Sequence, residues 1–264
     1  MKVGIYTNYL KDTNNLWTSK LKTALTENGI DFVDIREDSD KQDIDLLITL
    51  GGDGTLLKLV NFLIKNQVPV IGINAGKLGF LTEFETFEID ESVKLIKTNA
   101  LKEDLRLIMK AEVEGETFYA LNDMVIQRTY DDSLDKIVRT DVYIDENYVD
   151  RIDGDGVILN TPTGSTAYSL SAGGPILAPN LDSLSMTPIC PHSLHNRPMV
   201  FSANSSCKIT LANNCTCGIF MDGVMVKTVK KGQSVVVNKA SHTIKFLRKP
   251  DTNFYTRLLL KLKK

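Results

Sequence analysis

The chain has 264 residues, of which 42% are hydrophobic and 24% charged, and its formal net charge is −2 at pH 7. These values are typical of a folded protein with a sizeable core, in one large or two modest domains. They exclude the basic field that nucleic acid or an anionic membrane would require, so we expect neither partner. An anionic ligand must then be held by backbone donors and a few cations.

The amino-terminal part predicts alternating strands and helices. Its helices show apolar residues at helical spacing, and its strands are short apolar runs. Short links between them predict a parallel sheet flanked by helices. The expected strands lie at 2–7, about 32–36, 43–50 and 68–74, and the expected helices around 17–25, 55–66 and 91–98.

From about residue 102 the hydrophobic period changes to two, which indicates antiparallel strands. Hairpins are expected to turn near 114–115 and 145–147, and Asp222-Gly223 predicts a third tight turn. This half therefore predicts an all-β sandwich or barrel. A final helix is expected at about 252–262.

A glycine-rich loop interrupts two apolar runs in "LLITLGGDGTLLKLV". It places Gly51, Gly52, Asp53 and Gly54 between a predicted strand and a predicted helix, at the edge where open α/β sheets bind ligands. Glycines let backbone N–H groups approach a phosphate closely. The stretch lacks both the Walker lysine and the dinucleotide fingerprint. The alternative is a tight turn in which Asp53 only caps the helix.

Two further segments carry polar groups suited to a nucleotide. Residues 154–179 contain a dense set of hydroxyls, with Tyr168 as a flat face for a base. The hydroxyl residues are Thr161, Thr163, Ser165, Thr166 and Ser169. The pair Asn122-Asp123 interrupts an apolar strand and could bind ribose or base. The alternatives are a polar loop for the first segment and an ordinary bulge or sheet edge for the second.

Other conspicuous residues have simpler interpretations. The acidic run from Glu83 to Glu91 is expected to be a solvated entry to a helix, and Lys261, Lys263 and Lys264 a solvated tail. The four cysteines lack a zinc-site spacing and predict reduced, buried thiols. With no secretory signal or membrane-length apolar run, we expect a cytoplasmic protein.

Together these segments resemble the NAD kinase family of the bacterial type, and the block at 155–176 is the most specific part. The resemblance implies transfer of phosphate from ATP or polyphosphate to the adenosine 2′-hydroxyl of NAD, with a divalent metal, Mg²⁺, accompanying ATP. It implies an α/β domain over 1–100 joined by the C-terminal segment 250–264, and an NAD-binding β-sandwich over 101–249. It also implies a homotetramer with sites shared between subunits.

The resemblance carries roles to individual positions. Asp53 would be the base, Lys58 would meet phosphate, and Asn122 and Asp123 would hold the adenosine. The remaining positions, which would bind NAD or ATP, are Gly51, Gly52, Gly54, Lys136, Asp153, Asp155, Thr163, Thr166, Ala167, Tyr168, Ser169, Leu170 and Ser171. No residue is assigned to a protein-bound metal.

Three positions depart from the family pattern. Asp123 stands where the family usually has Glu, Asp153 where it often has Arg, and Val224 where it often has Gln. Two other functions remain open at this point. One is a lipid or other small-molecule kinase sharing the glycine loop, and the other is a non-catalytic NAD(P)-binding sensor.

Overall fold

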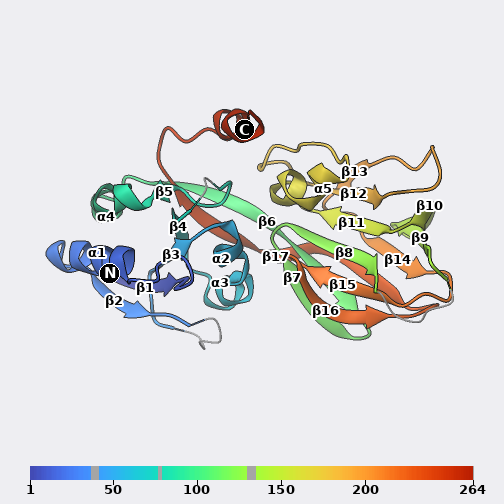
Figure 1. Ribbon diagram of the computed structural model, residues 1–264, viewed down its shortest axis with the longest axis horizontal. Coiled ribbons are helices and arrows are strands. Elements are labelled where there is room, and N and C mark those ends of the chain that lie inside the picture. The colour runs from blue at the N-terminus through green and yellow to red at the C-terminus, as the bar shows by residue number, and fades with distance from the viewer. Residues whose placement is uncertain (37–41, 77–78, 130–134, 264) are drawn as a thin grey trace. The chain divides into compact units, whose positions relative to one another are not determined.

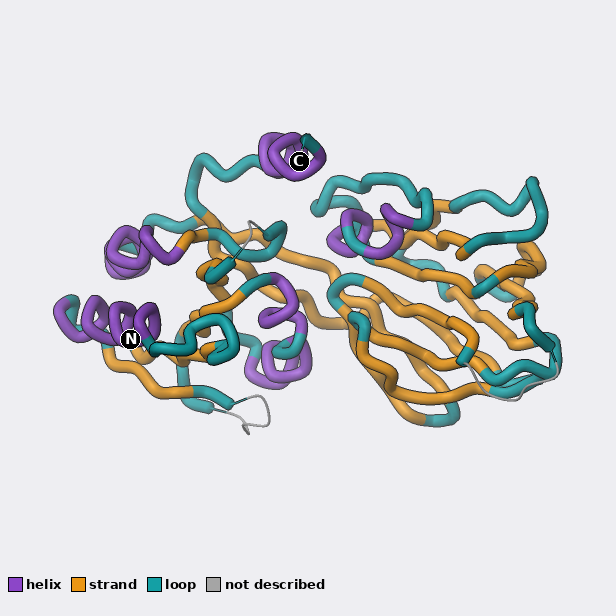
Figure 2. The backbone as a smooth tube through the Cα atoms, viewed as in Figure 1, coloured by secondary structure: helices purple, strands orange, loops and turns teal. Residues whose placement is uncertain are grey.

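The computed structural model describes residues 1–36, 42–76, 79–129 and 135–263. The chain divides into two compact units, one formed by Met1–Leu105 with Ile244–Lys264 and the other by Arg106–Thr243. The predicted fold class, an α/β part followed by a β-sandwich, is confirmed (Figures 1 and 2).

The first unit is built on a parallel sheet with the order β4-β3-β1-β2. Ile5 of β1 pairs with Ile48 of β3, which in turn pairs with Ile71 of β4. These apolar strands pack with helices α1 and α4 in one buried cluster. The elements of this unit are β1 (Lys2–Thr7), α1 (Leu16–Glu27), β2 (Asp31–Asp34), β3 (Leu46–Gly51), α2 (Asp53–Leu57), α3 (Val60–Asn66), β4 (Val70–Asn74), β5 (Phe84–Glu85), a 3₁₀ turn (Thr86–Glu88), α4 (Ile89–Lys97) and α6 (Phe254–Leu262).

The helix expected over 55–66 is two helices instead. At Leu59 the backbone N–H bonds to the carbonyl of Leu56, three residues back. This tighter bonding ends α2 and redirects the chain into α3, and it leaves Leu56, Leu59 and Val60 all buried. The helix is thus interrupted at a point where both leucines remain buried.

The second unit consists of two antiparallel sheets that share one apolar core. One contains the order β13-β12-β11-β8-β15-β16, and the other contains β10-β9-β14-β17. The predicted hairpins turn where expected, and Glu114, Asp145 and Asp222 have positive φ there. The elements are β6 (Lys102–Val113) and β17 (Ser234–Arg248), which both run on into the first unit, β7 (Glu116–Ala120), β8 (Asp123–Arg128), β9 (Val138–Ile144), β10 (Asn147–Gly154), β11 (Gly156–Asn160), a 3₁₀ turn (Thr163–Thr166), α5 (Tyr168–Ser171), β12 (Ser183–Ile189), β13 (Met199–Ser202), β14 (Cys207–Leu211), β15 (Cys217–Met221) and β16 (Val224–Val229).

Two minor expectations are wrong in part. Glu83, predicted to be solvated, is buried with 8% of its surface exposed, because two arginines surround its carboxylate. Cys190, predicted to be buried, is exposed, whereas the other three cysteines are buried. None of the helices in the described ranges is long and apolar enough to cross a membrane.

Candidate active site

The glycine loop lies where β3 ends and α2 begins. Thr55 stabilises the turn, since its Oγ1 accepts hydrogen bonds from the Gly52 N–H (3.2 Å) and from Asn8 Nδ2 (3.1 Å). A Cβ on Gly51 would lie 2.2 Å from that oxygen, so Gly51 is required by the turn. A Cβ on Gly54 would meet nothing within 4 Å. Gly54 therefore has no steric reason of its own to be glycine.

Asp53 does not cap its helix, so the simpler interpretation of this residue is wrong. Its carboxylate instead accepts backbone N–H groups from residues 80–82: Phe80 bonds to Oδ2 at 2.7 Å, and Leu81 and Thr82 bond to Oδ1 at 3.0 and 3.3 Å. A carboxylate offers about four acceptor positions, two on each oxygen. Among the described residues, these donors therefore leave one acceptor position on Oδ2.

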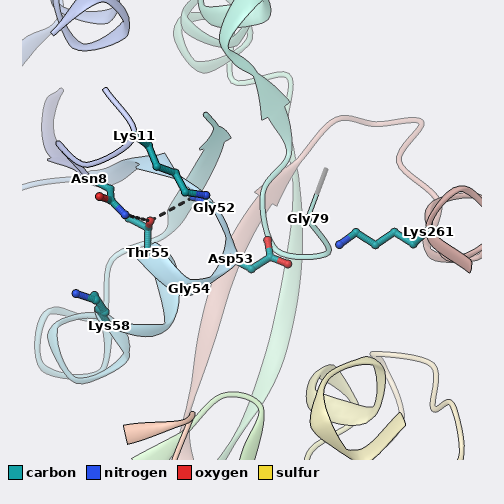
Figure 3. Close-up of a pocket in the computed structure, with 9 residues that line it drawn as sticks. All are labelled: Asn8, Lys11, Gly52, Asp53, Gly54, Thr55, Lys58, Gly79 and Lys261. Carbon is teal, nitrogen blue, oxygen red and sulfur yellow. Dashed lines mark hydrogen bonds between the residues drawn. The ribbon is translucent and has the colours of Figure 1, made fainter. Parts of the chain in front are cut away.

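A cleft of about 510 Å³ opens beside Asp53 (Figure 3). Three lysines from separate elements line it: Lys11 after β1, Lys58 at the end of α2, and Lys261 of α6. Lys58 was predicted to meet phosphate, and it lies in this cleft. The expectation that Lys261 belongs to a solvated tail is wrong, while Lys263 is exposed and Lys264 lies outside the described residues. The full lining is Asn8, Lys11, Gly52, Asp53, Gly54, Thr55, Lys58, Gly79 and Lys261.

Sequence reasoning missed Asn8, Lys11 and Lys261. A signal existed for the first two, because they follow β1, and parallel neighbours end at the same edge of a sheet. No local signal marks Lys261, because its approach to the glycine loop depends on where the last helix packs.

The second unit gathers three segments that are distant in sequence. The Asp222 carboxylate accepts the N–H groups of Leu121, Asn122 and Asp123 at 2.7–3.1 Å. The Asn122 carbonyl accepts the N–H of Thr161 at 2.9 Å. A Cβ on Gly164 would lie only 2.1 Å from the same carbonyl oxygen. The predicted Asn-Asp pair and the hydroxyl-rich block are thus packed against each other.

The buried Asp123 and the partly buried Asp222 form an acidic pair. Burial, and then the Asp222 charge, raise the pKa of Asp123 to about 7. Burial also raises the pKa of Asp222 to about 6, although its three N–H donors act in the opposite direction. Only 6% of the Asp123 surface is exposed. Asp222 was predicted only as a turn residue, and its Asp-Gly sequence gave no signal of this role.

The hydroxyl-rich block mostly uses its hydroxyls internally. Ser165 Oγ donates to the Pro162 carbonyl and accepts the Leu177 N–H, Ser169 Oγ bonds Thr187, and Thr163 accepts from Arg106. Thr163, Ser165 and Ser169 are all buried. Their side chains stabilise the loop. Because these hydroxyls are bonded within the protein, they do not form the nucleotide-binding cradle expected at these positions. Five predicted positions lie partly or fully at the surface: Thr166, Ala167, Tyr168, Leu170 and Ser171.

The other predicted positions lie on neighbouring strands of the second unit. Asp153 of β10 pairs with Arg139 of β9, whose Nε lies 3.0 Å from Asp153 Oδ1. The negative charge of Asp153 is therefore paired with an arginine of the neighbouring strand. Asp155 is exposed, and Lys136 is exposed with its carbonyl accepting from Arg128.

Within the described ranges, no group of three or more His, Cys, Asp or Glu residues could hold a metal ion. Among the described residues lining the cleft, Asp53 is the one carboxylate. The donor set is therefore one anion and three cations, which suits a polyanion more than a bare metal ion.

A carboxylate fixed by backbone donors, in a glycine-lined cleft rimmed by lysines at the carboxyl edge of a parallel sheet, is the arrangement of a phosphotransferase. Comparison with known proteins identifies which one. Residues 9–101 match the model of the ATP-NAD kinase N-terminal domain, and residues 121–249 match that of the C-terminal domain. The chain belongs to the NAD kinase family.

Relatives and solved structures agree with this assignment. The chain is 38% identical to an NAD kinase of Caldicellulosiruptor saccharolyticus over 264 residues, covering 100% of both chains. It is 36% identical to one of Clostridium perfringens, covering 98% of both. Yeast NADH kinase, solved with NADH, superimposes with a TM-score of 0.89 at 25% identity, over 100% of this chain and 87% of that one. An Archaeoglobus fulgidus NAD kinase, solved with ATP, shares the fold with a TM-score of 0.81 at 22% identity, over 100% and 99%.

Proposed function

We propose that this protein transfers the γ-phosphate of ATP to the adenosine 2′-hydroxyl of NAD and releases NADP. The observation that carries the proposal is the Asp53 carboxylate, which three backbone N–H groups hold at the edge of the lysine-lined cleft. Membership of the NAD kinase family supports NAD and ATP as the substrates. The match of both halves of the chain to ATP-NAD kinase domains favours this reaction over a lipid kinase or an NAD(P) sensor.

In this reaction Asp53 orients the hydroxyl that attacks the phosphorus. Phosphoryl transfer has a loose transition state, so positioning and neutralisation of charge supply most of the catalysis. The remaining acceptor position on Asp53 Oδ2 receives the hydroxyl hydrogen bond and takes the proton late. Lys11 and Lys58, which line the cleft, are the cations proposed to bind the donor phosphates. Mg²⁺ bound to ATP would be part of the donor substrate and would supply neutralisation of the phosphate charge.

In the second unit, Asn122 and Asp123 bind the adenosine part of NAD. Their backbone is fixed by Asp222 and by the packing of Gly164, so the two side chains start from a set position. Tyr168, which is 40% exposed on α5, offers its ring to a base. Thr166, Ser171 and Asp155 complete the accessible polar groups of this region, while Thr163 and Ser169 act by holding its shape.

A coupled assay tests the function directly. Purified protein with Mg-ATP is offered NAD, NADH and a diacylglycerol in separate reactions, and the phosphorylated product of each is measured. We expect NADP from NAD at a rate far above that from the lipid. Lipid phosphorylation alone would indicate the lipid kinase, and nucleotide binding without turnover would indicate the sensor. Replacing ATP by polyphosphate in the same assay identifies the donor.

We also propose a cytoplasmic homotetramer. Both edge strands of the six-stranded sheet expose apolar side chains: Met199 and Val200 on β13, and Val224 and Met225 on β16. Exposed apolar edges tend to be covered by association. Light scattering should give a mass near four times 29.4 kDa. A fully active monomer would contradict the tetramer without affecting the assignment of the reaction.

A further inference from the structure

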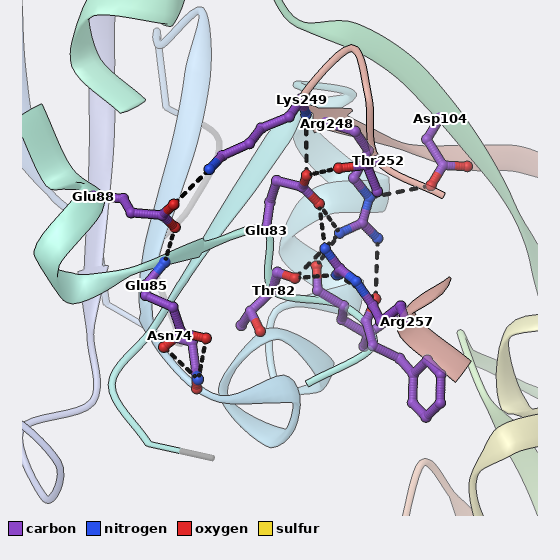
Figure 4. Close-up of polar contacts among 12 residues, drawn as sticks. Asn74, Thr82, Glu83, Glu85, Glu88, Asp104, Arg248, Lys249, Thr252 and Arg257 are labelled. Carbon is purple, nitrogen blue, oxygen red and sulfur yellow. Dashed lines mark hydrogen bonds and ion pairs between the residues drawn. The ribbon is translucent and has the colours of Figure 1, made fainter. Parts of the chain in front are cut away.

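Residues 80–82, whose N–H groups bond the Asp53 carboxylate, contact a buried ionic network (Figure 4). At its centre is Glu83, whose side chain is 1% exposed. Its Oε2 lies 3.1 Å from Arg248 Nη1 and 2.9 Å from Arg257 Nη2. Arg248 is 2% exposed and also bonds Asp104. A buried charge is tolerated only when it is paired and hydrogen-bonded, as each of these is.

The two arginines also bind the loop itself. Arg248 Nη1 donates to the Leu81 carbonyl at 2.7 Å, and Arg257 Nη1 donates to the Thr82 carbonyl and, at 3.3 Å, to that of Phe80. The N–H groups of the same stretch point at Asp53. The peptide groups of 80–82 are thus bonded to cations on one side and to the Asp53 carboxylate on the other. Bonds in such chains strengthen one another.

Arg257 comes from the last helix, α6, and so does a lysine of the cleft. Lys261 follows Arg257 by four residues, so the two side chains lie on the same face of the helix. Lys261 Nζ lies 4.9 Å from the centre of the Phe80 ring. Figure 3 shows its side chain extended toward Gly79 and Asp53. No residue of α6 is buried, so a requirement of the core does not explain this placement.

We propose that α6 contributes two functional residues, Arg257 and Lys261, to the phosphate-donor site. Arg257 is a positioning residue, which sets the Asp53 carboxylate through the backbone of 80–82. Lys261 binds the polyphosphate of the donor from the side of the cleft opposite the glycine loop. An ammonium group suits this task, because phosphate oxygens accept charge-assisted hydrogen bonds from it. This inference rests on the proposed function, since it assigns residues to the donor half of that reaction.

The role of Lys261 is tested by its effect on the donor alone. Lys261→Ala should raise the KM for Mg-ATP about tenfold, as expected for one lost charge-assisted contact, while the KM for NAD stays within twofold. Lys261→Arg should restore part of the loss. Lys263→Ala, an exposed lysine at the end of the same helix, is the matched control and should leave both constants unchanged. An unchanged KM for Mg-ATP in Lys261→Ala would overturn the assignment.

Binding without turnover gives a second readout. Tripolyphosphate is titrated into the wild type and into Lys261→Ala, and its Kd is measured by calorimetry. We expect the Kd to rise about tenfold in the variant and to remain unchanged in Lys263→Ala. Equal Kd values in all three proteins would exclude a donor-phosphate contact from Lys261.

Arg257 should act on the rate and leave substrate affinity unchanged. We expect Arg257→Ala to lower kcat about tenfold or more, with both KM values within twofold, because a displaced Asp53 affects the transition state more than ground-state binding. Arg257→Lys should recover part of the rate, since lysine keeps the positive charge but lacks the planar guanidinium that can bond several acceptors at once. An unchanged kcat in a folded Arg257→Ala protein would refute the positioning role.

Failure of this inference and failure of the proposed function give different results. If the wild type makes no NADP, the function is wrong. If the wild type makes NADP and the Lys261 and Arg257 variants match it, the function stands and α6 is only a surface helix.

Discussion

The glycine loop and the hydroxyl-rich block are equally suited to a ligand by their sequences, but they use their polar groups differently in the folded protein. At the glycine loop, Asp53 and the lysines line an open cleft. In the hydroxyl-rich block, Ser165 and Ser169 are completely buried and bonded within the protein. A dense polar segment can therefore be either a binding surface or the support behind one, and burial decides which.

The two regions also hold their carboxylates differently. Asp53 is half-buried, accepts three N–H groups and faces the cleft. Asp222, which is also partly buried, accepts three N–H groups as well, but these come from Leu121–Asp123, and its charge acts on the buried Asp123. The same bonding pattern thus fixes a carboxylate at the edge of a cleft in one unit and fixes the backbone of the Asn122-Asp123 segment in the other.

The largest expected effect is at Asp53. Asp53→Asn keeps the size of the side chain but places an amide donor against backbone N–H groups and removes the acceptor for the substrate hydroxyl. We expect kcat to fall by about 10²-fold or more, with the Kd for NAD little changed. Asp31→Asn, at an exposed position of β2, is the control. Turnover within threefold of the wild type would show that Asp53 is not the catalytic group.

A smaller effect is expected at Asp123. If its ionised carboxylate accepts a hydrogen bond from the adenosine ribose, Asp123→Ala should lower kcat/KM for NAD by about 10–100-fold at pH 8, above the Asp123 pKa of about 7, because bonds to charged groups contribute about 1.5–3 kcal/mol. The KM for ATP should change far less. Asp123→Glu, which restores the usual family residue, should keep activity within about tenfold. If kcat/KM for NAD is unchanged in Asp123→Ala, Asp123 does not bind the ribose and is only a buried residue of its strand.

Two glycines sharpen the contrast between the regions. Gly164→Ala should lower the free energy of unfolding by about 1–3 kcal/mol, because the new Cβ overlaps a backbone carbonyl. Gly54→Ala has open space and lies in a helix, so it should stabilise the protein by about 0.5–1 kcal/mol while impairing phosphate transfer. Thermal unfolding and the coupled assay, run on both variants, check this. Loss of stability in Gly54→Ala would contradict it.

The smallest expected effect is a pH dependence of stability from the acidic pair. The pKa values of Asp123 and Asp222 are raised from 3.8 to about 7 and about 6, so the folded state holds protons that the unfolded chain releases. Their contribution to stability is present below about pH 4 and is lost as the pH rises through 6 to 7.

A variant isolates this contribution from the other titrating groups. Asp123→Asn removes one carboxylate of the pair, so its melting temperature relative to the wild type should be higher at pH 8 than at pH 5. A difference between the two proteins that is independent of pH would show that Asp123 has an ordinary pKa.

The sequence by itself determined the class of fold and the elements that flank the site. The change from helical spacing to a period of two separated the α/β part from the β part, because each period reflects burial on one face of an element. It also placed Asp53 at the end of a buried strand, and the turns at 114–115, 145–147 and 222–223, because local backbone preferences decide such features.

Only the tertiary structure decided how the polar groups are used. Glu83 and Lys261 resemble ordinary solvated charges in the sequence, yet one is buried between two arginines and the other lines the cleft. Asp222 resembles a turn residue and instead organises the Asn122-Asp123 segment. In each case the partner lies about a hundred residues or more away in the chain. The pattern of neighbouring residues carries no information about such a partner, because packing of distant elements creates the contact.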